Sequence, residues 1–125
     1  MVGSSLALAL SHLPLDVVLI DPFAPTDEQA PGFDARAIAL SRASAKIMNS
    51  LGLWSDIKSD ACPIKTIHVS DKGRPGICRF TAEEVNIPAM GYVVELENVG
   101  KVMETALAKT RVKRYCPSEV TAIDQ

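Results

Sequence analysis

The sequence predicts an α/β protein, because its first residues pass from a helical pattern directly to a strand of the parallel type. Leu6, Leu10 and Leu13 recur at helical spacing. Pro14 ends that pattern, and residues 17–20 then form an apolar run of strand length that closes on Asp21. A near-continuous apolar strand after a helix is typical of a parallel strand covered on both faces.

Gly3, Ser4 and Ser5 lie where the opening helix is expected to begin, and a serine suits its N-cap. A parallel strand needs a neighbour, yet no strand precedes this helix. The chain is therefore expected to open inside a βαβ unit and to leave one edge of the strand at residues 16–21 unpaired.

Gly3 and Asp21 also fit part of a dinucleotide-binding fingerprint. In G-x-G-x-x-G the last glycine permits close packing of helix on strand, and an acid roughly 20 residues later binds the ribose. Gly3 fits that glycine and Asp21 fits that acid. One glycine and one acid also arise by chance, so a purely structural role for both is the alternative.

The next segment predicts a polar loop, a short apolar segment and two helices. Prolines punctuate residues 22–32, and residues 37–40 are apolar. Ser41 or Ser44 is expected to cap the following helix, and Gly52 suits the position after its end. A second helical piece is expected over residues 53–57. The apolar face of the first of these helices is predicted to comprise Ala43, Ile47, Met48 and Leu51.

Arg36 lies at the end of the polar loop and is a candidate anion ligand. A guanidinium group can hold a phosphate or a ribose oxygen. A solvated surface arginine is the alternative, and spacing alone does not choose between the two.

The second half of the chain predicts a β-hairpin followed by a mixed segment. Residues 64–69 and 77–81 are strand-like and flank a turn rich in glycine and proline at 71–76. After a loop at 82–91, a strand is expected at 92–96, a helix at 97–109 and two short strands at 112–115 and 120–123.

Composition excludes several classes of protein. The 13 basic and 15 acidic residues give a net charge of −2, so no basic excess points to nucleic acid. No apolar run approaches the roughly 20 residues of a transmembrane helix. Three cysteines without a C-x-x-C pair argue against a disulfide framework or a zinc site and favour reduced thiols in the cytoplasm.

Four segments resemble one family. They are MVG with the LALA that follows, PGFDARAIAL at 31–40, HVSDKG at 68–73 and VVELENVG at 93–100. Together they resemble the N-terminal part of the 2-polyprenyl-6-methoxyphenol hydroxylase family, the FAD-dependent aromatic monooxygenases of ubiquinone biosynthesis. That family is about three times longer, and its glycine motif reads GGGMVG, so Met1 resembles an internal methionine and the chain an N-terminal fragment.

The resemblance implies a fold and a cofactor site. The fold would be a partial FAD-binding Rossmann-like fold over residues 1–60, the start of a β-sheet substrate domain over 61–92, and a return to the FAD-binding domain over 93–125. Gly3 and Ser4 would face the FAD pyrophosphate, because helix N-termini favour anions. Asp21 would bind the ribose, and Arg36 would reach the cofactor. No catalytic side chain is implied.

The resemblance also implies an activity. The family uses reduced flavin and oxygen to hydroxylate a polyprenylated phenol, with NAD(P)H or another reductant as electron donor. A cytoplasmic protein at the membrane periphery is expected, with other ubiquinone-biosynthesis proteins or a second copy as partners.

Two departures limit this expectation. The family's first strand and the first two glycines of its motif have no counterpart here. The later Asp-Gly and Gly-Asp motifs of the family have no counterpart here, so this chain is expected neither to hold FAD tightly nor to turn over. The alternatives are another FAD- or NAD(P)-dependent oxidoreductase and a non-enzymatic remnant that is stable only as an oligomer.

Overall fold

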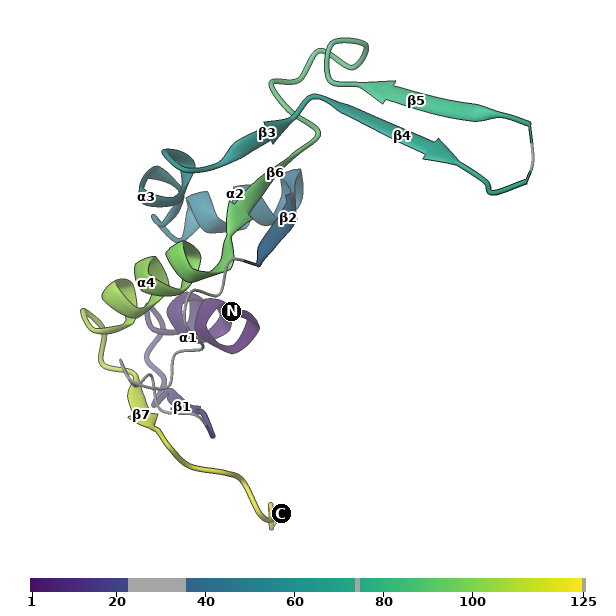
Figure 1. Cartoon of the computed structure of the whole chain (residues 1–125). Helices are drawn as coiled ribbons and strands as arrows, with labels where there is room; N and C mark the ends of the chain where they lie inside the picture. The colour runs from purple at the N-terminus through teal and green to yellow at the C-terminus, as the bar shows by residue number, and fades with distance from the viewer. Residues whose placement is uncertain (23–35, 74, 125) are drawn as a thin grey trace. The chain divides into compact units, whose positions relative to one another are not determined.

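The computed structural model describes residues 1–22, 36–73 and 75–124, which form two compact units. The terminal unit combines residues 1–35 with residues 96–125, and the middle unit is the continuous segment 36–95 (Figure 1). The expected polar loop falls mostly outside the described residues. Helices and strands occur in both units, which confirms the α/β class.

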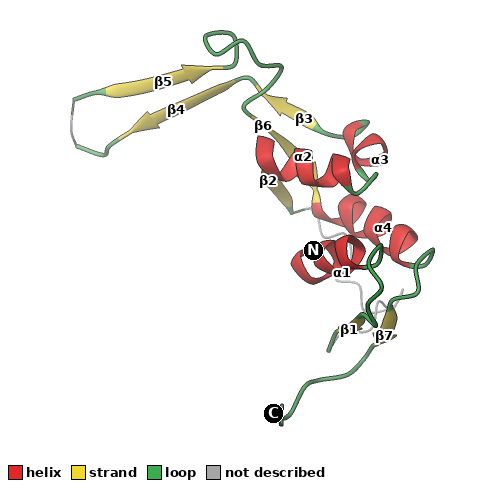
Figure 2. Ribbon diagram, turned by 180° about the vertical axis from the view of Figure 1, so that it is seen from behind, coloured by secondary structure: helices red, strands yellow, loops and turns green. Residues whose placement is uncertain are grey.

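The described part of the terminal unit contains two helices and a pair of parallel strands (Figure 2). They are α1 Val2–Leu10, β1 Val18–Ile20, α4 Leu96–Leu107 and β7 Lys113–Tyr115. β1 pairs with β7, and α1 packs against α4 and β1. The buried side chains of this unit are Ala7, Leu8, Val99, Met103 and Leu107.

The opening helix forms as predicted, but its cap and its buried face differ from the prediction. Met1 is the N-cap and no side chain caps the helix, because the serines already lie inside the first turn. Ser5 Oγ instead donates to the Met1 carbonyl at 2.9 Å. Leu8 is buried while Leu6 and Leu13 are exposed. The helix is apolar on nearly every side, so leucine spacing alone could not select the buried face.

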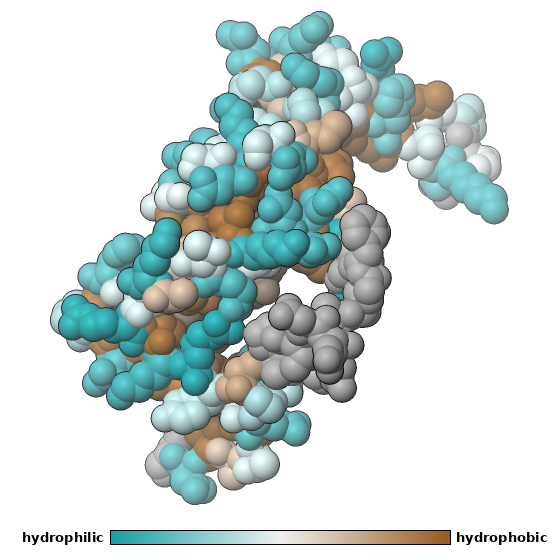
Figure 3. Space-filling model, turned by 60° about the vertical axis from the view of Figure 1, so that its left-hand side comes forward, coloured by the Kyte–Doolittle hydropathy of each residue, from teal (hydrophilic) through white to brown (hydrophobic). Residues whose placement is uncertain are grey.

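β1 is a parallel strand, as predicted, but it is not covered on both faces. Leu19 points toward α1, whereas the neighbouring Val18 and Ile20 project to the opposite side and remain exposed. The strand expected at 120–123 does not form, since no described strand pairs with those residues and Ile123 is exposed. Figure 3 shows such apolar surface, in brown, among hydrophilic side chains.

The middle unit contains a three-stranded antiparallel sheet of order β2-β6-β3. The strands of this sheet are β2 Ala37–Ser41, β6 Gly91–Glu95 and β3 Cys62–Ile64. The helices of the middle unit are α2 Arg42–Ser50 and α3 Trp54–Lys58. Trp54 meets Tyr92 edge to face at a centroid distance of 4.8 Å. The buried side chains of this unit are Leu40, Ala45, Met48, Leu53, Ile57, Ala82, Ala89 and Val94.

Local signals predicted both ends of α2. Ser41 is the N-cap, and its Oγ accepts from Ser44 N–H at 3.0 Å. Gly52 follows the C-cap Leu51 with φ of +74°, a left-handed conformation that glycine adopts without strain. The predicted apolar face was wrong at Ala43 and Ile47, which are both exposed. Ala45 and Met48 are the residues of α2 that are buried.

The hairpin forms as predicted from β4 Thr66–Ser70 and β5 Ile77–Thr81. The single strand expected at 64–69 is divided, however, because β3 and β4 belong to different sheets. The Ile64 carbonyl accepts from Met90 N–H at 2.8 Å, and the Lys65 carbonyl accepts from Ala82 N–H at 2.9 Å. The chain therefore changes sheets between these two residues.

Gly91 allows β2 and β6 to approach, and this yields a stability prediction. A Cβ at Gly91 would lie 2.6 Å from the Leu40 carbonyl oxygen, so Gly91→Ala must displace backbone. We expect it to lower the free energy of unfolding by about 1–3 kcal/mol in urea titrations. Gly100→Ala in α4 is the control, because a Cβ there meets nothing within 4 Å. It should stabilise the chain by about 0.5–1 kcal/mol. Equal effects of the two substitutions would contradict the steric explanation.

Candidate cofactor site

Gly3 lies where α1 packs against Leu19 of β1. A Cβ at this position would lie 3.3 Å from Leu19 Cδ1, which is closer than most real Cβ contacts. A larger residue would require the Leu19 side chain or the helix to shift by a few tenths of an ångström. This close packing is the role that the last glycine of a dinucleotide fingerprint performs.

The N-terminus of α1 presents backbone donors. Ser5 N–H makes the first intrahelical bond, to the Met1 carbonyl at 2.9 Å. The preceding N–H groups of Val2, Gly3 and Ser4 have no acceptor within the helix. Together with the helix dipole, such groups favour an anion at this end. Gly3 is exposed and Ser4 is half-buried.

Asp21 directly follows β1, and two backbone hydrogen bonds join it to the chain in and just after β7. Its N–H donates to the Tyr115 carbonyl at 3.0 Å, and its carbonyl accepts from Ser118 N–H at 2.9 Å. Asp21 follows Leu19 by two residues, and a Cβ at Gly3 would lie beside Leu19 Cδ1. Gly3 and Asp21 are therefore both neighbours of Leu19, the first in space and the second in sequence.

Arg36 belongs to the middle unit, where it is exposed and immediately precedes β2. Gly3, Ser4 and Asp21 belong to the terminal unit. Three of the four predicted site residues thus belong to one unit. That Arg36 contributes to the same cofactor site as these residues stays a prediction.

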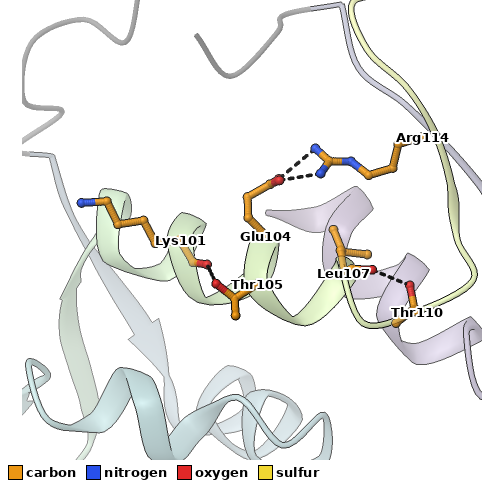
Figure 4. Close-up of polar contacts among 6 residues, drawn as sticks. All are labelled: Lys101, Glu104, Thr105, Leu107, Thr110 and Arg114. Atoms are coloured by element: carbon orange, nitrogen blue, oxygen red, sulfur yellow. Dashed lines mark hydrogen bonds and ion pairs between the residues drawn. The ribbon is translucent and has the colours of Figure 1, made fainter. Parts of the chain in front are cut away.

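A bidentate ion pair holds β7, the partner of β1, against α4. Arg114 Nη1 lies 2.5 Å from Glu104 Oε2, and Arg114 Nη2 lies 3.0 Å from Glu104 Oε1 (Figure 4). Both side chains are partly exposed, so we expect at most about 1 kcal/mol of stability from the pair. No local sequence signal predicted it, because the two residues come from different elements.

One other ion pair lies on α4, one turn from Glu104. Lys101 Nζ donates to Glu97 Oε1 at 2.5 Å. The hydrogen bond and the charge of Glu97 raise the pKa of Lys101. The pair is solvent-exposed and does not involve the residues of the candidate site.

Several other chemistries lack support among the described residues. No group of three or more histidine, cysteine or acidic side chains there could hold a metal ion. No disulfide joins any of the three cysteines. In the described part of the chain, no helix combines the length and the apolar character that crossing a membrane requires. No catalytic side chain is identified among the described residues.

Relatives cover nearly the whole chain. A ubiquinone hydroxylase, UbiL of Rhodospirillum rubrum, is 32% identical over 98% of this chain and 29% of its own length. The 3-demethoxyubiquinol 3-hydroxylase of Escherichia coli is 29% identical over 98% of this chain and 32% of its own length. An uncharacterized protein of Synechocystis is 32% identical over 95% of this chain and 28% of its own length. The chain spans about a third or less of the length of each of these relatives. No protein-family profile matches the chain.

Proposed function

Because the chain is homologous over nearly its whole length to hydroxylases of ubiquinone biosynthesis, an enzyme family, we propose that it carries the nucleotide-binding start of an FAD-dependent monooxygenase. Its substrate would be a polyprenylated methoxyphenol. The packing of Gly3 on Leu19, two residues before Asp21, is the observation on which this proposal rests.

The residues present fit the adenosine end of FAD. The free N–H groups at the start of α1 would bind the pyrophosphate, and the Asp21 carboxylate would accept hydrogen bonds from the ribose. Arg36 would bind a phosphate or ribose oxygen with its guanidinium group. When bound, the reduced flavin supplies the activation of oxygen, and this chain contributes placement of the cofactor.

We further propose that the chain adopts part of a Rossmann-like fold, with FAD-binding segments at residues 1–60 and 93–125. The parallel pair β1–β7 with α1 packed on it supports this fold. Residues 61–92 would begin the substrate-domain sheet, and the antiparallel hairpin β4–β5 lies within them. The compact units divide instead after residues 35 and 95, so these boundaries rest on the family resemblance.

The chemistry of the substrate favours a place of action. A polyprenyl tail partitions into the bilayer, whereas the phenol ring must reach the flavin. We propose that the longer enzyme works in the cytoplasm at the membrane surface, with other ubiquinone-biosynthesis proteins as partners and NAD(P)H or another reductant as electron donor.

A titration with ADP tests the proposed nucleotide site. Binding to the isotope-labelled chain should shift the amide resonances of Gly3, Ser4 and Asp21. Asp21→Asn should weaken binding about tenfold, because the ribose loses hydrogen bonds to a charged acceptor. Asp16→Asn, which precedes β1 at its opposite end, is the control and should leave the affinity unchanged. Equal losses for both variants, or shifts confined to other residues, would overturn the assignment.

Absorbance after incubation with FAD tests the expected weakness of cofactor binding. A chain with only these contacts should lose its yellow colour on gel filtration. A stoichiometric flavin complex that survives gel filtration would contradict this expectation, because it would show that this chain alone suffices to hold FAD.

A further inference from the structure

Positive charge is concentrated in one short segment of the terminal unit. Residues 105–118 contain four basic residues and no acidic residue. The basic residues are Lys109, Arg111, Lys113 and Arg114. Because this segment contributes +4 to a chain whose net charge is −2, the rest of the chain carries −6. The positive charge is therefore a local feature of β7 and of the loop that joins α4 to it.

Three of these cations belong to the open surface of the unit. Lys109, Arg111 and Lys113 are all exposed. Among the described residues, the ion pairs on α4 engage none of these three. Burying a cation without an ionic partner is strongly unfavourable. A surface that carries three such cations therefore faces either water or an anionic partner, in this chain and in a longer one alike.

Exposed leucines lie beside these cations. The loop from α1 to β1 adjoins the loop from α4 to β7, because the Lys113 N–H donates to the Val17 carbonyl at 3.0 Å. Both loops line a hollow of about 210 Å³, whose lining includes Leu13, Leu15 and Arg111. Leu13 is 52% exposed and Leu15 is 58% exposed. The three cations and the two leucines therefore share one surface, here termed the basic–leucine surface.

The basic–leucine surface lies at the amino ends of two parallel strands. β1 and β7 pair in parallel, and each begins where its loop ends. Strands that continued this sheet would lie beside β1 or β7, whereas the loops lie at the strand ends. The surface is therefore not a sheet edge that a further strand would cover. Asp21 follows the carboxyl end of β1, so these loops and the candidate nucleotide site lie at opposite ends of the strand.

We propose that the basic–leucine surface binds a bilayer that contains anionic phospholipids. The negative surface potential of such a bilayer attracts the three cations. Leu13 and Leu15 would enter the boundary between headgroups and acyl chains, as apolar side chains of peripheral proteins do. Asp16 also lines the hollow, but the three cations outnumber it.

A lipid is favoured over other anionic partners by the proposed function, on which this choice rests. That function places the enzyme at the bilayer, where a polyprenyl substrate resides. The exposed leucines favour the same partner, because an apolar patch rimmed by charges is typical of membrane and protein interaction sites. An acidic protein partner would give no binding to vesicles.

Cosedimentation of the full chain with vesicles tests the partner. The chain should bind vesicles of phosphatidylcholine that contain about one third phosphatidylglycerol, and should bind pure phosphatidylcholine at least about tenfold more weakly. Raising NaCl from about 0.05 M to about 0.5 M should also weaken binding at least about tenfold, because salt screens exposed charges. No binding to the anionic vesicles, or equal binding to the two compositions, would overturn the proposal.

Charge removal tests the location of the surface. Changing all three of its cations to glutamine should lower the partition coefficient on anionic vesicles at least about tenfold. A triple variant of Arg42→Gln, Lys46→Gln and Lys58→Gln is the matched control, because it removes one arginine and two lysines from exposed positions of the middle unit. The control should retain most of the binding. An equal loss in both triple variants would show that binding follows net charge alone and would overturn the proposal.

A leucine substitution tests the apolar contribution. Leu15→Gln should lower the partition coefficient about threefold or more, because less apolar area leaves water. Leu6→Gln is the control, since Leu6 is 59% exposed on α1 and does not line the hollow. Equal binding of these two variants would contradict insertion of Leu15. Vesicle binding requires no nucleotide, so a chain that binds vesicles through this surface but fails the ADP titration would refute the nucleotide site alone.

Discussion

Ile57→Ala is expected to destabilise the middle unit by about 2–5 kcal/mol, enough to unfold it if the unit is only marginally stable. Ile57 is 1% exposed on α3, so truncating it leaves a cavity in the core of this unit. Trp54, the single tryptophan of the chain, lies on the same helix and contacts Tyr92. Its fluorescence during urea unfolding therefore reports on this unit.

Ile47→Ala is the matched control for that experiment. It removes the same atoms from α2, but Ile47 is 57% exposed. Its effect should stay within about 0.5 kcal/mol. If both substitutions shift the urea midpoint equally, the assignment of Ile57 to the core is wrong.

Leu8→Ala is expected to have a comparable effect on the terminal unit, again about 2–5 kcal/mol. Leu8 is 5% exposed on α1, whereas Leu6 on the same helix is 59% exposed and serves as the control. Hydrogen exchange of the α1 and α4 amides should accelerate in Leu8→Ala and remain unchanged in Leu6→Ala. Because α1 also presents the free N–H groups, ADP-induced shifts at Gly3 should be lost together with the protection of α1. If Leu8→Ala loses the protection of α1 but retains the ADP-induced shifts at Gly3, ADP binding does not depend on the packing of α1.

Features governed by neighbours in sequence were predictable. The Ser41 cap, the glycine after α2 and the hairpin all follow from a few adjacent residues, and the structure confirms them. Several predictions that failed concern which side of an element is buried. In α1 most residues are apolar, so tertiary contacts rather than periodicity decide that Leu8 is buried and Leu6 is exposed.

The candidate site was predictable only in part, for the same reason. Gly3 and Asp21 were identified from their spacing and from the family resemblance. Their setting depends on Leu19, on the Tyr115 carbonyl and on Ser118, which are brought together by pairing between the two ends of the chain. No local pattern predicts such pairing. Likewise, the change of sheet after Ile64 depends on hydrogen bonds from Met90 and Ala82, which follow much later in the sequence.

The discontinuous terminal unit has a consequence for synthesis on the ribosome. Val18 pairs with Lys113, so β1 emerges 95 positions before its partner. At about 5–20 residues per second, that delay lasts roughly 5–20 seconds. The contiguous middle unit can fold co-translationally during this interval. The apolar side chains of α1 and β1 remain exposed until α4 and β7 have been synthesised. Chaperone engagement should therefore concentrate on the first 22 residues and end once residue 115 has left the exit tunnel.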